Sequence, residues 1–126
     1  MDCPITDPSK EAMVREILGR IADKWTLLVI EALDCETEIR FSRLQERVGS
    51  ISQRMLTKTL RNLERDGLVT RHVHPTVPPR VDYKLTPLGE SLGEAVCGMW
   101  MWIEKHVDAV GNARRTFDTR SQQPAA

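Results

Sequence analysis

Apolar residues recur at spacings of three and four over most of the chain, a pattern that predicts a mainly helical protein. Residues 10–25 form a first amphipathic segment, with Ser9 as its expected N-cap. Its apolar stripe consists of Met13, Val14, Ile17, Leu18 and Ile21. Residues 24–33 are apolar on nearly every side, so we expect them to form a buried central helix.

Residues 41–48 predict a short helix that ends in a sharp turn. Ser42 is its expected N-cap, and Leu44 and Val48 are spaced for burial on one face. Gly49 is expected to end this helix and to make the turn into the next one.

A second short helix is predicted over residues 52–66, and its two faces differ in chemistry. Ser52 is the expected N-cap and Gly67 the left-handed stop. The apolar face consists of Met55, Leu56, Thr59, Leu60 and Leu63. The opposite face consists of Gln53, Arg54, Thr57, Lys58, Arg61 and Arg65. We therefore expect one face in the core and the other, polar and cationic, at the surface.

Alternating apolar and polar residues over 68–74, and a second short run at 81–85, predict a β-hairpin. The connection contains Pro75, Pro78 and Pro79, followed by Arg80. Proline lacks a backbone donor, so this connection stays out of the strand ladder. Residues 39–41 are expected to add a third strand. Two short helices followed by a hairpin are typical of a winged helix-turn-helix, so the expected fold class is α+β, mainly α.

The last predicted helix runs from 86 to about 111, with Thr86 as N-cap and Pro87 in the first position. Its repeating apolar positions include Leu88, Leu92, Met99, Ile103 and Val107, and Trp100 and Trp102 widen that surface. So much apolar surface at the end of a small domain seeks a partner. We expect a dimerisation helix with Leu88, Leu92, Met99 and Ile103 in the interface; the alternative is that it folds back on its own core.

Length and charge refine this picture. The chain has 126 residues, enough for one domain, which we place at 1–111 with a flexible polar tail at 112–126. Its formal net charge is zero, but residues 40–84 carry a net charge of +6 and the remainder −6. A basic middle between acidic ends provides one face for phosphate. No signal peptide and no membrane-spanning run are recognised, so we expect a cytoplasmic protein that does not enter the membrane.

The sequence gives little support for a catalytic site or a metal site. Cys3, Cys35 and Cys97 are odd in number and lack the CxxC spacing, a pattern of reduced thiols. Cys97 lies within the last apolar helix and is expected to be buried and inert. His72 and His74 have no cysteine pair nearby to complete a zinc site, and we expect them to be solvated or to face phosphate. We expect no enzyme, no cofactor and no metal.

The cationic helix and the hairpin together indicate double-stranded DNA as the partner. The first turn of a recognition helix meets base edges, so Gln53 and Arg54 are the expected contacts there. Ser52, the N-cap, is also expected among the DNA-binding residues. Thr57 can serve bases or phosphate, and Lys58 and Arg61 lie where phosphate is expected. Arg80 can enter a minor groove or pair with phosphate. The alternatives are a solvated amphipathic helix and an exposed turn arginine.

Three stretches of the sequence resemble the HxlR family of MarR-like winged-helix regulators. They are DKWTLLVIEAL, RFSRLQERVGSISQRMLTKTLRNLERDGLV and VPPRVDYKLTPLGESL, and the resemblance covers about residues 12–93. It implies a homodimer formed through the terminal helices that binds palindromic operators, with recognition helices roughly 34 Å apart. We expect a transcriptional regulator that acts as a repressor. The family often has a glycine pair before Lys-Trp, where this chain has Ala22-Asp23.

The resemblance also implies a role for Cys3. Several members of the family carry a cysteine just before the first helix and use it to sense electrophiles or oxidants, and Cys3-Pro4 stands in that place here. The alternatives are an incidental terminal thiol and a regulator that binds a non-covalent ligand between the dimer helix and the central helix. The alternative from a different class of function is a winged-helix module that binds proteins and not DNA.

Overall fold

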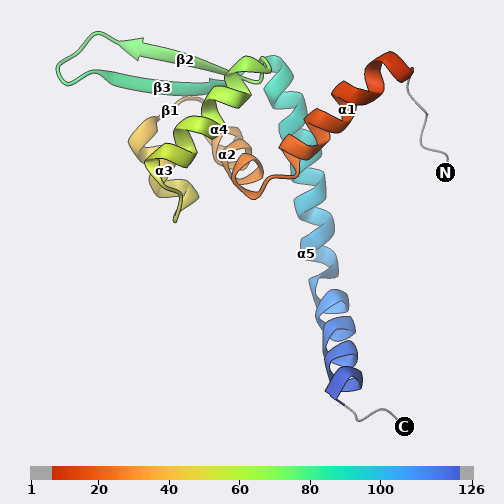
Figure 1. Cartoon of the computed structure of the whole chain (residues 1–126). Coiled ribbons are helices and arrows are strands. Elements are labelled where there is room, and N and C mark those ends of the chain that lie inside the picture. The colour runs from red at the N-terminus through yellow and green to blue at the C-terminus, as the bar shows by residue number, and fades with distance from the viewer. Residues whose placement is uncertain (1–6, 123–126) are drawn as a thin grey trace.

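The computed structural model describes residues 7–122, and it is mainly helical with one small sheet (Figure 1). The elements are α1 (Pro8–Ile21), α2 (Lys24–Cys35), β1 (Ile39–Arg40), α3 (Phe41–Val48), α4 (Gln53–Arg65), β2 (Val69–His74), β3 (Arg80–Leu85) and α5 (Pro87–Gln122). The strands form an antiparallel sheet in the order β1-β3-β2. This confirms the α+β, mainly α, winged helix-turn-helix that the sequence predicts.

The core surrounds α2, as expected from its apolar composition. Val29, Ile30 and Leu33 of that helix are buried. They belong to one cluster with Leu44 of α3, Leu56, Leu60 and Leu63 of α4, and Val69, Tyr83 and Leu85 of the sheet. The apolar faces predicted for the two short helices thus pack inward, which leaves the polar face of α4 outside. Two predicted core positions differ: Met55 is 37% exposed, and Val48 is only partly buried.

Glycine and a capping serine set the ends of the two short helices. Gly49 ends α3 with a φ of 97°, and Gly67 follows α4 with a φ of 77°; both lie in the region that favours glycine. Ser52 caps α4, because its Oγ accepts a hydrogen bond of 3.1 Å from the Met55 N–H. These three predictions are confirmed.

Two other predicted caps are wrong. Helix α1 begins at Pro8, and its N-cap is Asp7, whose carboxylate accepts a 3.1 Å hydrogen bond from the Ser9 N–H. The Pro at the first position places the start one residue before the expected cap. Helix α3 follows strand β1 directly, so Arg40 occupies its N-cap position without a side-chain hydrogen bond, and Ser42 lies inside the helix.

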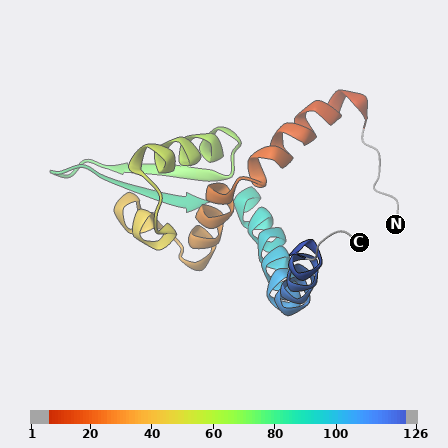
Figure 2. The same ribbon diagram turned by 60° about the horizontal axis from the view of Figure 1, so that its bottom comes forward.

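The terminal helices project from the body as two arms (Figures 1 and 2). No residue of α1 is buried. Helix α5 continues to Gln122, so the expected end near residue 111 and the loose tail after it are wrong for the described residues. Residues 112–122 contain no proline and no glycine, so nothing in the sequence interrupts the helix there. At 1.5 Å per residue α5 is roughly 54 Å long.

Cys97 also differs from expectation. It lies in α5 and is exposed: the preceding residue, Val96, faces the core, and Cys97 lies on another side of the helix. Among the described residues, no helix is long and apolar enough to cross a membrane.

Both arms are attached near the C-terminal end of α4. The Thr86 hydroxyl donates a 2.6 Å hydrogen bond to the Gly67 carbonyl and accepts a 3.0 Å bond from the Gly89 N–H in the first turn of α5. At the other arm, Arg20 at the end of α1 forms an ion pair with Asp66, the C-cap of α4. The orientation of α4 is therefore tied to both terminal helices.

Candidate nucleic-acid interface

The outward face of α4 carries the residues predicted to contact DNA. Ser52, Gln53, Arg54, Thr57, Lys58 and Arg61 are all exposed. Leu56 and Leu60 anchor the opposite face, at 0% and 1% relative exposure. The amphipathic pattern thus positions one polar surface around the first two turns of a helix whose orientation the core fixes.

Two hydroxyl groups on this face are partly engaged within the helix. Ser52 Oγ accepts the capping hydrogen bond, which leaves its own proton free to donate to phosphate. The Thr57 hydroxyl donates a 2.8 Å hydrogen bond to the Gln53 carbonyl, so toward another molecule it serves as an acceptor.

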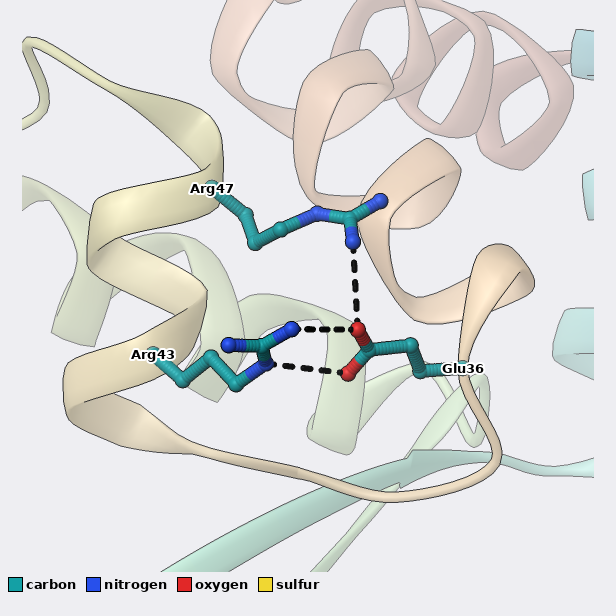
Figure 3. Close-up of polar contacts among 3 residues, drawn as sticks. All are labelled: Glu36, Arg43 and Arg47. Carbon is teal, nitrogen blue, oxygen red and sulfur yellow. Dashed lines mark hydrogen bonds and ion pairs between the residues drawn. The ribbon is translucent and has the colours of Figure 1, made fainter.

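The cations of α3 and α4 differ in their partners. Figure 3 shows Glu36, after α2, between two arginines of α3: Arg43 Nη2 and Arg47 Nη1 lie 3.0 and 3.1 Å from the same Glu36 oxygen. The hydrogen bond from Arg43 is the main cause that lowers the pKa of Glu36 below its ordinary value. The charge on α3 is therefore partly compensated from within the protein.

The cations on the outer face of α4 are not compensated in this way. Within residues 7–122, none of Arg54, Lys58 and Arg61 forms an ion pair. A positive face without internal partners attracts phosphate more strongly than one that is already paired. Of the two helices of the motif, α4 is accordingly the better polyanion-binding surface.

An open groove of about 1030 Å³ separates α4 from the wing. Four arginines line it: Arg40 of β1, Arg61 of α4, Arg71 of β2 and Arg80 of β3. Sequence reasoning assigned Arg61 and Arg80 to the interface but missed Arg40 and Arg71. The signal for Arg71 was present, because alternation places it on the same side of β2 as Val69, which is buried in the core.

Arg80 begins β3, and a neighbour on the same strand holds its side chain. Its Nε donates a 3.0 Å hydrogen bond to Asp82 Oδ1. His74 Nε2 donates to the other Asp82 oxygen at 2.9 Å. The bond from Arg80, and then that from His74, lowers the pKa of the Asp82 carboxyl. Sequence reasoning did not single out Asp82.

His74 therefore differs from expectation, because it is paired inside the wing instead of being solvated or facing phosphate. His72 lies edge-on against it, with ring centroids 4.4 Å apart. Glu38, His74 and Asp82 bring one potential ligand atom each within 4.8 Å of the others. Both Asp82 oxygens already accept hydrogen bonds, one of them from a guanidinium, so this cluster fits an internal ion pair better than a metal site.

Comparison with known proteins places this geometry in a family. The sequence model of the HxlR-like helix-turn-helix family matches residues 20–110. The chain belongs to the HxlR-like helix-turn-helix family. It is a DNA-binding transcriptional regulator and not an enzyme.

Individual relatives and solved structures also match most of the chain. The HTH-type transcriptional regulator YtfH of Escherichia coli strain K12 is 42% identical over 96 residues, 76% of this chain and 75% of YtfH. The structure of the regulator ytfH from Salmonella typhimurium has a TM-score of 0.76 at 38% identity, covering 81% of this chain and 90% of that one. The reduced form of the redox regulator HypR has a TM-score of 0.72 at 37% identity, covering 79% and 98%.

The remaining predicted residues of this HxlR-like chain lie away from the groove. Leu88, Met99 and Ile103 on α5 are at least half exposed, at 58%, 50% and 51%. Leu92 is half-buried and packs against the core of its own chain. Cys3 lies outside the described residues.

Proposed function

We propose that this regulator is a cytoplasmic homodimeric repressor that binds a palindromic operator with α4 in the major groove and the wing beside it. The observation that carries the proposal is the exposed polar face of α4, which borders an arginine-lined groove. Arg54, Lys58 and Arg61 on this face form no ion pair within residues 7–122. A major groove admits a helix of this kind, and the hairpin reaches the neighbouring backbone or minor groove.

The individual contacts follow from position along α4. Gln53 and Arg54 lie in the first turn and pair with base edges, since Gln suits adenine and Arg suits guanine. Ser52, Lys58 and Arg61 contact phosphate and set the register. Thr57, whose hydroxyl proton is bonded to the Gln53 carbonyl, accepts a hydrogen bond from a donor on a base edge. Arg80 extends the contact to the wing side, where the groove continues.

The arms support the homodimer. Apolar residues on α1 and α5 are exposed in the single chain, including Leu18 at 63% and Trp102 at 58%. A surface of this kind needs a cover, and a second copy offers the same apolar arms. In this arrangement Leu88, Leu92, Met99 and Ile103 belong to the interface.

Cys3 is proposed as a sensor of electrophiles or oxidants. The resemblance to family members with a cysteine before the first helix motivates this role, and the named redox regulator HypR is a structural neighbour. Modification of Cys3 would act through α1, because Arg20 in the last turn of α1 pairs with Asp66, the C-cap of α4. A small change in the arm is thereby passed to the helix that contacts DNA.

Fluorescence anisotropy tests the proposal. A labelled duplex from the region upstream of the gene is titrated with the full chain at several salt concentrations. The expected result is tight binding that weakens steeply with salt, is lost on addition of diamide and returns with dithiothreitol. Cys3→Ser should keep the affinity and lose the response to diamide.

Other outcomes separate the parts of the proposal. Salt-sensitive binding that ignores diamide keeps the repressor and overturns the role of Cys3. A non-covalent effector then becomes the better explanation, and an open pocket of about 330 Å³ between the end of α2 and the start of α5 is the place to search. If Arg54→Ala weakens binding equally on the upstream duplex and on a scrambled one, Arg54 contacts phosphate and not a base.

A further inference from the structure

Asp82 is an unusual residue for the middle of a wing strand. Its relative exposure is 3%, although aspartate is rarely buried unless it is paired. Each of its oxygens accepts one hydrogen bond, from Arg80 Nε at 3.0 Å and from His74 Nε2 at 2.9 Å. A buried carboxylate with two directed bonds holds its partners in place.

The register of the hairpin explains how the three groups meet. His74 and Arg80 are opposite each other on β2 and β3. Asp82 follows Arg80 by two residues, so both side chains leave the same face of β3. The carboxylate therefore lies beside both partners, close to the Pro-rich connection at the tip of the wing.

The bond to Asp82 engages only one of the three guanidinium nitrogens. Within residues 7–122, no hydrogen bond or ion pair is formed by the two terminal nitrogens of Arg80, and its side chain is 48% exposed. A guanidinium held through Nε presents its two terminal nitrogens outward as a fork, the geometry that matches phosphate oxygens.

We propose that Asp82 is a positioning residue for DNA binding: it holds Arg80 through Nε so that the terminal nitrogens face the DNA. This inference rests on the proposed function, because it needs Arg80 to contact DNA. Asp82 itself does not touch the nucleic acid. Its contribution is to remove, before binding, the rotational freedom that a free arginine would lose on contact.

The sign of the effect separates this role from plain electrostatics. Removing a negative charge beside a DNA-binding surface should strengthen binding, since the protein becomes more positive. If Arg80 is no longer held in position, DNA binding should become weaker. Asp82→Asn keeps the shape of the side chain, removes the charge and leaves Arg80 only a weaker, neutral acceptor, so the direction of the change in Kd distinguishes the two effects.

Glu38 provides the matched control. Its carboxylate lies close to His74 and Asp82, but within residues 7–122 it makes no hydrogen bond to the Arg80 guanidinium. Glu38→Gln therefore removes one negative charge from a neighbouring, exposed position without removing a bond to Arg80. Its Kd should stay unchanged or fall.

The test is a double-mutant cycle in the full chain, with anisotropy on the upstream duplex and on a 24-base-pair A·T-rich duplex. Asp82→Asn should raise Kd roughly 3- to 10-fold. Arg80→Ala should also raise Kd and reduce the salt slope by about 1. In the Arg80→Ala background, Asp82→Asn should change Kd less than about twofold, because its effect passes through Arg80.

Folding is monitored by circular dichroism, and Asp82→Ser serves as a second neutral variant should the Asn variant be partly unfolded. The NMR signal of Arg80 Nε–H in the free protein gives a readout apart from DNA: in Asp82→Asn it should broaden or exchange faster. Tighter binding by Asp82→Asn, or an equal loss in the Arg80→Ala background, overturns the role of Asp82. Failure of the parent chain to bind either duplex overturns the proposed function itself.

Discussion

The body of this regulator, residues 24–85, and its two arms use apolar residues in opposite ways. Leu60 in the body is 1% exposed, whereas Leu18 in the first arm is 63% exposed. The last buried apolar residue of α5 is Val96, and beyond it the helix leaves the body. The body is thus stabilised by its own contacts, and the arms present surface that another molecule must cover. Sequence periodicity is the same in both, so periodicity alone does not reveal which surface is covered within one chain.

The largest expected effect is on the arms. Ile103→Asp places a carboxylate in the proposed dimer interface, where an unpaired charge costs several kcal/mol. Sedimentation velocity should show a monomer at concentrations where the parent chain is a dimer, and binding to the upstream duplex should be lost with it. Lys105→Asp, two residues away on another side of the helix, is the control and should stay dimeric. An intact Ile103→Asp dimer would contradict the role of α5.

A matched pair of leucine truncations compares the regions directly. Leu60→Ala should lower the free energy of unfolding by about 2–5 kcal/mol at any protein concentration, because it leaves a cavity in the core. Leu18→Ala should have almost no effect in dilute monomer and should weaken the dimer. Urea unfolding at two protein concentrations measures both. If Leu18→Ala lowered the free energy of unfolding of the monomer as much as Leu60→Ala does, α1 would have to pack on the body of its own chain.

Two glycines of α5 sharpen the boundary between body and arm. A Cβ at Gly89 would overlap the Leu68 carbonyl, whereas a Cβ at Gly98 would meet nothing within 4 Å. Gly98→Ala should therefore stabilise the helix by about 0.5–1 kcal/mol, and Gly89→Ala should destabilise the chain despite the same gain in helix propensity. Thermal unfolding checks the signs. If Gly98→Ala weakens the dimer, a partner approaches the helix at that glycine.

Short-range signals predicted the body well. The apolar pattern gave the helices and the core, and Ser52, Gly49 and Gly67 identified the ends of α3 and α4 because each residue acts on its own local backbone. The caps of α1 and α3 were wrong where a neighbour competed. Asp7 displaced Ser9 at α1, and the strand before α3 left no room for a side-chain cap.

The part of the candidate interface that lies on one helix was predictable from the sequence, and the part that depends on how the strands pair was not. The outer face of α4 follows from helical periodicity. Arg71 and Asp82 gain their roles from the register of β2 against β3 and from the approach of α4, which are long-range features. The length of α5 was underestimated because polar composition at residues 112–122 indicated a loop, although those residues contain no helix breaker.

The smallest expected effect is a pH dependence of the free energy of unfolding, and it arises in the body. Hydrogen bonds from Arg80 and then His74 lower the pKa of Asp82 below its ordinary value of 3.8. A carboxyl whose pKa is lowered on folding adds stability above its unfolded value, and this stability is lost as pH falls through the folded value. The difference in unfolding free energy between the parent chain and Asp82→Asn should therefore be greatest above pH 3.8 and should shrink below it. Urea unfolding at pH 7, 5 and 3 measures this.

Glu36→Gln should change the pH dependence less, because Glu36 is more exposed and water screens its pairs with Arg43 and Arg47. A difference for Asp82→Asn as large at pH 3 as at pH 7 would mean that folding does not lower the pKa of Asp82.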